Sequence, residues 1–209
     1  MEPGTRVSVH FHDAARSRST SLDLLASVLR QMELLFLILI LSTGALLGNE
    51  FSIGAFIHPA LSREGHERFL PAIQVFARLF GKIMPFWMAA TLLLHLILLV
   101  LTWRWPALST VLLLFATLLW LAIIIFSLVG PVPINNRVTV WDLQNLPPDW
   151  RQQRQRWDQL HAIRVVIIAI AFLALVGSYG TASSAIERNR AGSSAIERET
   201  DGGLIAKPV

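Results

Sequence analysis

Four long apolar blocks constrain this chain more than any other feature. They run from about residue 34 to 57, 83 to 103, 105 to 130 and 165 to 182. Each is about as long as the ~20 residues that an α-helix needs to cross the hydrocarbon core of a bilayer. The runs lack the two-residue alternation of a barrel strand, and a single segment satisfies its backbone groups in lipid only as a helix. We therefore predict four transmembrane helices.

The overall composition agrees with a membrane protein. Hydrophobic residues make up 54% of the 209 residues and charged residues only 15%, against about a quarter charged in an ordinary soluble domain. The absence of cysteine excludes disulfides, thiolate metal sites and cysteine nucleophiles. The net charge of +4 comes from loops and tails rather than from one basic surface. The expected partner is therefore the lipid bilayer and not nucleic acid.

These blocks predict an all-α fold: an antiparallel bundle of four transmembrane helices, with a long polar loop between helices 3 and 4 that caps one end. Residues 33–182 form the predicted transmembrane domain, preceded by a tail with an interfacial helix at 1–32 and followed by a disordered polar tail at 183–209. An even number of spans places both termini on one side of the membrane. The 18 Lys and Arg residues divide equally between the two sides, so the positive-inside rule leaves that side undetermined.

Two loops on the side opposite the termini carry most of the polar residues. The first is predicted from His58 to Lys82, and the second from Pro131 to Arg164. The prolines at the start of the second loop are expected to end the third span and to hold an extended segment, because a residue before proline avoids the helical region. From Asp149 the pattern becomes helical. One face of that helix then carries alternating aromatic, cationic and imidazole groups: Trp150, Arg154, Trp157, His161 and Arg164.

Every predicted span contributes polar or ionisable groups to the same mouth of the bundle. Such groups are costly in a membrane and are functional candidates for that reason. They are Glu50, His58, Lys82, Asn135, Asp158, His161 and Arg164. His95 lies about 12 residues into the second span and therefore deeper.

Three stretches of the sequence resemble a known family of integral membrane proteins. They are Gly44…Asn49-Glu50…His58-Pro59, then Pro131-Val132-Pro133-Ile134-Asn135, and finally Trp157-x-x-x-His161-x-x-Arg164. Together they resemble the DUF1772 or anthrone-oxygenase-like family over about residues 35–180, with the second and third stretches the more specific. The resemblance implies a multi-pass helical fold. It also implies an oxygenase of a lipophilic aromatic or phenolic substrate, since some members are associated with oxidation of an anthrone to an anthraquinone and many others have no assigned activity.

Two chemistries fit these residues. The first is a metal site formed by Glu50, His58, Asp158 and His161, with iron or copper as the expected metal. Asp158 and His161 have the carboxylate-x-x-His spacing of bundle metal sites, although only one such motif is present. The second is cofactor-free oxygenation of a phenolic carbon acid. In that case His161 is the base, and Arg164, Lys82 and Asn135 stabilise the oxyanion that forms.

Simpler interpretations stand beside these two. Asp158 and Arg154 are four residues apart and are able to pair on one helix. Arg164 is able to reach lipid phosphates, and Trp150 and Trp157 are expected to be interfacial anchors. His95 is expected to form a hydrogen bond across helices, with axial haem ligation as the less favoured role. The alternative functional class is non-enzymatic: an accessory or assembly subunit, which could form a homo-oligomer, or a small-molecule exporter.

Overall fold

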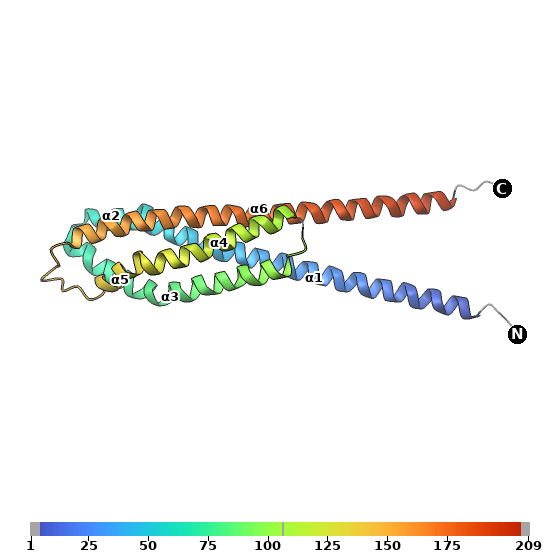
Figure 1. Cartoon of the computed structure of the whole chain (residues 1–209), viewed down its shortest axis with the longest axis horizontal. Coiled ribbons are helices and arrows are strands. Elements are labelled where there is room, and N and C mark those ends of the chain that lie inside the picture. The colour runs from blue at the N-terminus through green and yellow to red at the C-terminus, as the bar shows by residue number, and fades with distance from the viewer. Residues whose placement is uncertain (1–4, 106, 206–209) are drawn as a thin grey trace. The chain divides into compact units, whose positions relative to one another are not determined.

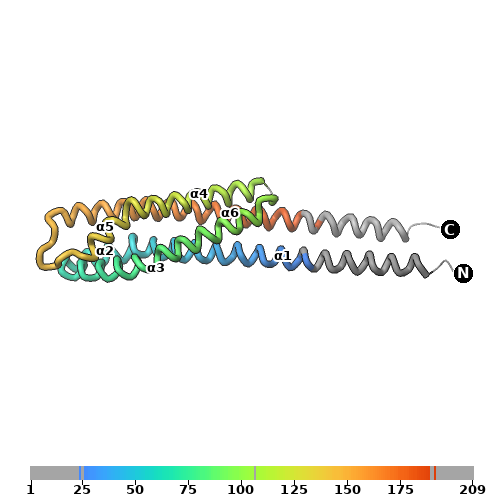
Figure 2. The backbone as a smooth tube through the Cα atoms, turned by 60° about the horizontal axis from the view of Figure 1, so that its bottom comes forward, coloured from blue at the N-terminus to red at the C-terminus, as the bar shows by residue number. Residues whose placement is uncertain are grey.

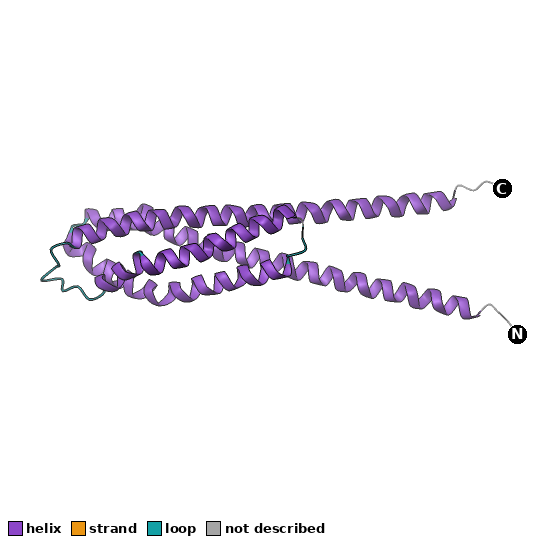
Figure 3. Ribbon diagram, viewed as in Figure 1, coloured by secondary structure: helices purple, strands orange, loops and turns teal. Residues whose placement is uncertain are grey.

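The computed structural model describes residues 5–105 and 107–205, and every element in that part of the chain is helical. The all-α fold class is therefore confirmed (Figures 1 and 3). In chain order the elements are α1 (Thr5–Ser52), a π-helical turn η1 (Ile53–Ile57), α2 (His58–Arg63), α3 (His66–Leu101), α4 (Ala107–Val129), α5 (Pro131–Val138) and α6 (Trp150–Ile205).

Four helical segments are long and apolar enough to cross a membrane. They are Ala26–Arg63, His66–Leu101, Ala107–Val138 and Trp150–Arg188. Each overlaps one of the four predicted blocks, and the predicted ends at 103 and 105 lie just outside the second and third segments. The chain is thus a multi-pass integral membrane protein.

The chain divides into two compact units between Ile38 and Leu39. The first consists of the opening part of α1. In the second, α4 lies beside α6 in both backbone views and packs against it and against α3 (Figure 2). A buried apolar cluster holds the middle of this second unit together: Leu46, Met88, Trp120, Ile123, Ile168 and Ala171.

A second buried cluster joins α3 to α5 and to the start of the loop that follows α5. Its members are Phe69, Leu70, Ile73, Ile134, Val138 and Trp141. The buried Gln74 amide donates hydrogen bonds to the carbonyls of Val138 (3.0 Å) and Trp141 (2.9 Å). Because the last carbonyls of a helix have no partner within it, Gln74 supplies donors at the end of α5 and fixes α5 on α3.

The structure corrects the first predicted loop. Residues His58–Arg63 are helical, and α3 begins at His66, so only Glu64 and Gly65 separate two helices. Gly65 has a φ of +85°, a conformation that glycine adopts without steric cost, and it allows the chain to reverse there. The charged residues in this stretch lower its mean hydropathy, although the stretch is amphipathic. Its apolar side chains Phe69, Leu70 and Ile73 are buried in the second cluster.

The structure also corrects the extended segment predicted after Gly130. Pro131 and Pro133 begin the helix α5. Proline is tolerated in the first turn of a helix because its missing N–H would have no acceptor there. The remaining non-helical stretch, 139–149, lies at the end of the unit opposite the α3–α4 connection (Figure 3). That this stretch caps the mouth of the bundle stays a prediction.

The domain boundaries proposed from the sequence also stay predictions. Helix α6 continues to Ile205, while residues 1–4 and 206–209 lie outside the described part of the chain. Most side chains of the predicted N-terminal and C-terminal tails are likewise outside it.

Four spans make a simple prediction about topology. Epitope tags on the two ends of the chain are expected to be labelled from the same side of sealed vesicles. Each span carries the chain across the membrane, so four spans return it to the side on which it began. Labelling of the two tags from opposite sides would show that one of the four helices does not cross the bilayer.

Candidate functional site

A buried ion pair joins the first span to the fourth. The Glu50 carboxylate accepts a hydrogen bond from the Arg164 guanidinium, and both side chains are almost fully buried. Glu50, one of the groups expected at the mouth of the bundle, is 3% exposed. Since a lone ion inside a membrane protein is costly, each of these two groups requires the other.

His161 completes this network and is fixed in one neutral tautomer. Its Nε2 lies 2.8 Å from the backbone carbonyl of Glu50, and a carbonyl only accepts, so Nε2–H is the donor. Its Nδ1 lies 3.2 Å from Arg164 Nη2, and a guanidinium only donates, so Nδ1 is the acceptor. Glu50 Oε2 lies 3.4 Å from Nδ1 of His161. Both ring nitrogens of His161 are thus engaged by Glu50 and Arg164.

The π-helical turn η1 lets the first span approach His161 closely. A Cβ atom added to Gly54 would lie 2.9 Å from His161 Cδ2 and 3.1 Å from Nε2, so only glycine leaves room for the imidazole. Single π-turns within α-helices occur frequently at functional sites. The sequence interpretation did not include Gly54. The available signal was a glycine one helical turn after the only ionisable residue of its span.

The close approach predicts the effect of Gly54→Ala. Overfilling this contact is expected to destabilise the protein by about 1–3 kcal/mol and to break the hydrogen bond between His161 and the Glu50 carbonyl. Gly48→Ala is the matched control, because a Cβ there meets no atom within 4 Å. Denaturant unfolding in micelles and imidazole ¹⁵N chemical shifts measure the two effects. Equal behaviour of the two variants would contradict the assigned role of Gly54.

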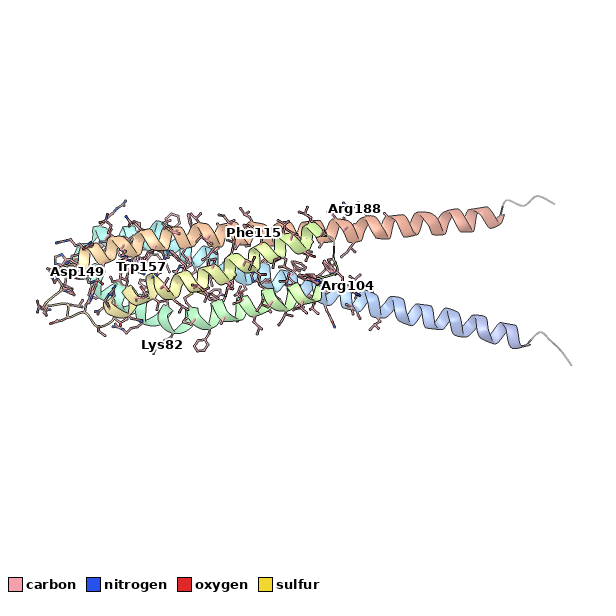
Figure 4. The ribbon with its side chains drawn as sticks, viewed as in Figure 1. Lys82, Arg104, Phe115, Asp149, Trp157 and Arg188 are labelled. Carbon is pink, nitrogen blue, oxygen red and sulfur yellow. The ribbon has the colours of Figure 1, made fainter. Side chains whose placement is uncertain are left out.

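Trp157 lies between two imidazole rings. It stacks on His161 and on His58, with a ring-centroid distance of 4.5 Å in each case. Figure 4 shows Trp157 near the end of the bundle that also carries Asp149. The indole was expected to be an interfacial anchor, whereas the structure places it inside the polar cluster. Its spacing of four residues before His161 was the signal, since such residues are neighbours on one helix face.

His58 forms a second polar pair with Asp158. His58 Nδ1 lies 3.3 Å from Asp158 Oδ1, and Arg154 Nε lies 3.8 Å from the other carboxylate oxygen. The predicted i, i+4 pairing of Arg154 with Asp158 is therefore confirmed. His58 is buried, whereas the Asp158 side chain is 42% exposed, so this pair connects the cluster to the outside of the bundle.

A cavity of about 260 Å³ lies against both polar pairs. Its polar wall includes Glu50, His58, Arg154, His161 and Arg164. Most of the remaining wall is apolar and comes from α3, α4 and α5, for example Phe76, Phe80, Met84, Met88, Ile124 and Ile134. A mostly apolar cavity with a few convergent polar groups is typical of a small-molecule site.

The other predicted site residues divide into two groups. Asn135 lines the cavity from α5. Lys82 is exposed on the outer side of α3 and does not line the cavity (Figure 4). His95 was expected to bond across helices, but its Nδ1 lies 2.9 Å from the Thr91 carbonyl of its own helix, and its ring stacks on Trp120.

The four predicted metal ligands do not fit a metal centre in this arrangement. No group of three His, Asp or Glu side chains suited to a metal occurs among the side chains that the structure describes. The candidates divide instead into the His58–Asp158 pair and the Glu50–His161 pair. The two nitrogens of His161 are also already engaged.

The fold and site define the class of protein: a four-span helical membrane protein with a buried Glu–Arg–His cluster beside an apolar cavity. Residues 74–174 match the family model described as anthrone oxygenase, so the chain is similar to this family over that region. The matched region contains Asn135, Asp158, His161 and Arg164, whereas Glu50 and His58 precede it. Comparison with curated proteins and with solved structures gave no match.

Proposed function

We propose that the protein is a membrane-embedded oxygenase of lipophilic phenolic carbon acids, of the anthrone type, and that the cavity is its substrate site. One observation carries this proposal: a largely apolar cavity of small-molecule size ends at a buried cluster of ionisable groups. The apolar walls suit a flat aromatic substrate, and the cluster suits a substrate that develops negative charge. The match of residues 74–174 to the anthrone oxygenase family model supports the same reaction class.

The proposed chemistry uses the acidity of the substrate. Loss of a C–H proton from an anthrone gives a carbanion whose charge spreads onto its carbonyl oxygen, and this electron-rich anion reacts with molecular oxygen. When a methylene becomes a carbonyl, one atom of O₂ enters the product and the other leaves as water. The residues of the chain then have two tasks: to accept the proton and to stabilise the oxyanion.

Arg164 and Asn135 are the proposed oxyanion partners, because both line the cavity and both carry hydrogen-bond donors. His161 is the proposed positioning residue for Arg164, since its Nδ1 accepts from Nη2 while Glu50 binds the same nitrogen. Lys82 was predicted to share the oxyanion role. Its exposed position outside the cavity does not support that role.

Oxygen-isotope incorporation tests this function. Purified protein in lipid nanodiscs is incubated with a tricyclic phenolic anthrone under ¹⁸O₂, and the product is analysed by mass spectrometry. We expect a quinone product that is 2 Da heavier and forms faster than in empty nanodiscs. Absence of acceleration and of binding across several phenolic carbon acids would overturn the proposal and favour the accessory or exporter class. A stoichiometric metal required for turnover would overturn the cofactor-free chemistry.

The route into the cavity is proposed to lie between α3 and α4. Gly81, Pro85 and Ala89 recur every four residues along one stripe of α3, line the cavity and are exposed. Leu128 of α4 is also exposed and lines the same cavity. Because these residues lie within membrane-spanning helices, a lipophilic substrate dissolved in the bilayer reaches the cavity without crossing water.

A pair of adjacent alanines tests this route. Ala89→Trp places an indole in the proposed opening, and we expect it to lower kcat/KM for a tricyclic substrate by about tenfold or more, a barrier change of about 1.4 kcal/mol. Ala90→Trp is the control, because Ala90 is also exposed but does not line the cavity. Steady-state rates in nanodiscs give the comparison. Equal rates for both variants would place the entrance elsewhere.

A further inference from the structure

The His58–Asp158 pair has the geometry of an acid–base dyad. A carboxylate oxygen accepts hydrogen bonds, so His58 Nδ1–H is the donor across the 3.3 Å to Asp158 Oδ1. In the neutral ring the lone pair is then on Nε2. The hydrogen bond to Asp158 uses Nδ1, and Nε2 of His58 forms none with any residue that the structure describes. His58 also lines the cavity, so its unengaged nitrogen belongs to a ring in the wall of the proposed substrate site.

Neighbouring rings fix the orientation of His58. Trp157 stacks on one side of the imidazole, with 29° between the ring planes, and Phe69 meets it edge to face at 5.8 Å between ring centroids. The Arg154 guanidinium lies 4.0 Å from the centre of the Phe69 ring. The imidazole is therefore held by aromatic contacts as well as by Asp158. A base held in one orientation does not lose conformational freedom at the moment of reaction.

The two histidines of the cavity differ in the availability of their nitrogens. Both nitrogens of His161 are engaged, one by the Glu50 carbonyl and the other by Arg164. A proton on Nδ1 of His161 would lie near the Glu50 carboxylate, 3.4 Å away, but it would displace the hydrogen bond that Nδ1 accepts from Arg164 Nη2 at 3.2 Å. His58 has one nitrogen free and has a carboxylate on the other, which stabilises the imidazolium once a proton arrives.

We propose that His58 is the base that removes the substrate proton and that Asp158 orients it and stabilises its charged form. This inference rests on the proposed function. In the step, the acidic C–H bond of the substrate breaks and an Nε2–H bond forms. The electron pair stays on the substrate, where it is delocalised onto the carbonyl oxygen beside Arg164 and Asn135. Nothing is oxidised in this step. Asp158 is 42% exposed, so the dyad also offers the proton a way to water.

Deuterium exchange without oxygen tests this step by itself. An anthrone is incubated in D₂O under argon with the protein in nanodiscs, and loss of the acidic proton is followed by NMR. His58→Asn is the informative variant, because its amide can still donate to Asp158 but has no basic nitrogen. We expect it to lower the protein-dependent exchange rate by about 100-fold or more. Asp158→Asn is expected to give a smaller loss.

Two controls make the result decisive. His66→Asn replaces an exposed histidine at the start of α3 that does not line the cavity, and its exchange rate is expected to equal that of the wild-type protein. Substrate binding and thermal unfolding of His58→Asn show whether the variant is folded. If that variant does not fold, Asp158→Asn and the ¹⁵N shifts of His58 during substrate titration replace it.

The outcomes separate this inference from the proposed function. Exchange that depends on His58, without ¹⁸O incorporation under ¹⁸O₂, would support the base assignment and overturn the oxygenase. Oxygenation by the wild-type protein, together with unchanged exchange in His58→Asn, would overturn the base assignment and keep the oxygenase. Loss of exchange in a folded His161→Gln protein, with His58→Asn unaffected, would move the base to His161. A wild-type protein that does not accelerate exchange would overturn the base assignment directly.

Discussion

Arg164→Met is expected to destabilise the protein by about 3–5 kcal/mol, because it leaves the Glu50 carboxylate buried without its cation. Glu50 is 3% exposed and lies within a membrane-spanning helix. Unfolding by a denaturing detergent, followed by circular dichroism, measures the change. The effect should exceed that of any surface arginine in the chain.

A double-mutant cycle identifies the source of this cost. Glu50→Gln/Arg164→Met removes both charges, so no unpaired ion remains in the interior. We expect it to lower the free energy of unfolding by less than the sum of the two single changes. Arg156→Met removes an exposed arginine from the same helix and should change stability by no more than about 0.5 kcal/mol. Additive effects of the two single changes would show that the buried pair is not coupled.

His161→Ala is expected to lower the rate of oxygenation by about 10²–10³-fold, the usual cost of misplacing one oxyanion donor. The physical reason is the position of Arg164, whose Nη2 group donates to both Glu50 and His161. Removing the imidazole also removes the bond to the Glu50 carbonyl and one ring of the Trp157 stack. Oxygen-isotope incorporation under saturating substrate gives the rate.

His161→Gln distinguishes positioning from proton transfer. Its amide can donate to the Glu50 carbonyl, so a positioning role predicts that stability and part of the activity return and that anaerobic exchange is retained. A base role predicts loss of exchange in both variants. The variant His66→Asn is again the control, because it replaces an exposed histidine outside the cavity. Full activity in His161→Ala would exclude both roles.

The sequence determined the class and the spans because the membrane imposes a local rule. Each run of about 20 apolar residues must satisfy its own backbone as a helix, so each of the four blocks coincides with one long helix of the structure, to within about two residues at its ends. The face of Trp150, Arg154, Trp157, His161 and Arg164 was also a local property, since a spacing of three or four residues places side chains together on one helix. The family followed from short motifs, and the family match agrees.

Hydropathy predicted the two loops wrongly because it does not detect helices that are polar on one face. Residues 66–82 belong to α3, and the prolines at 131 and 133 begin a helix instead of an extended segment. Which side of a helix contacts α3 or α5 depends on partners far away in the chain. The contact of Gln74 with the carbonyls of Val138 and Trp141 is one such case.

Only the tertiary structure decided how the polar residues are paired. The sequence placed seven groups at one mouth, but it contains no information on which atoms meet across 111 residues, as His161 Nε2 and the Glu50 carbonyl do. That contact depends on a π-helical turn and on the missing Cβ of Gly54. The same packing leaves Lys82 outside the cavity and divides the predicted metal ligands into two pairs. Span formation depends on neighbouring residues in the chain, whereas the chemistry of the site depends on distances between helices.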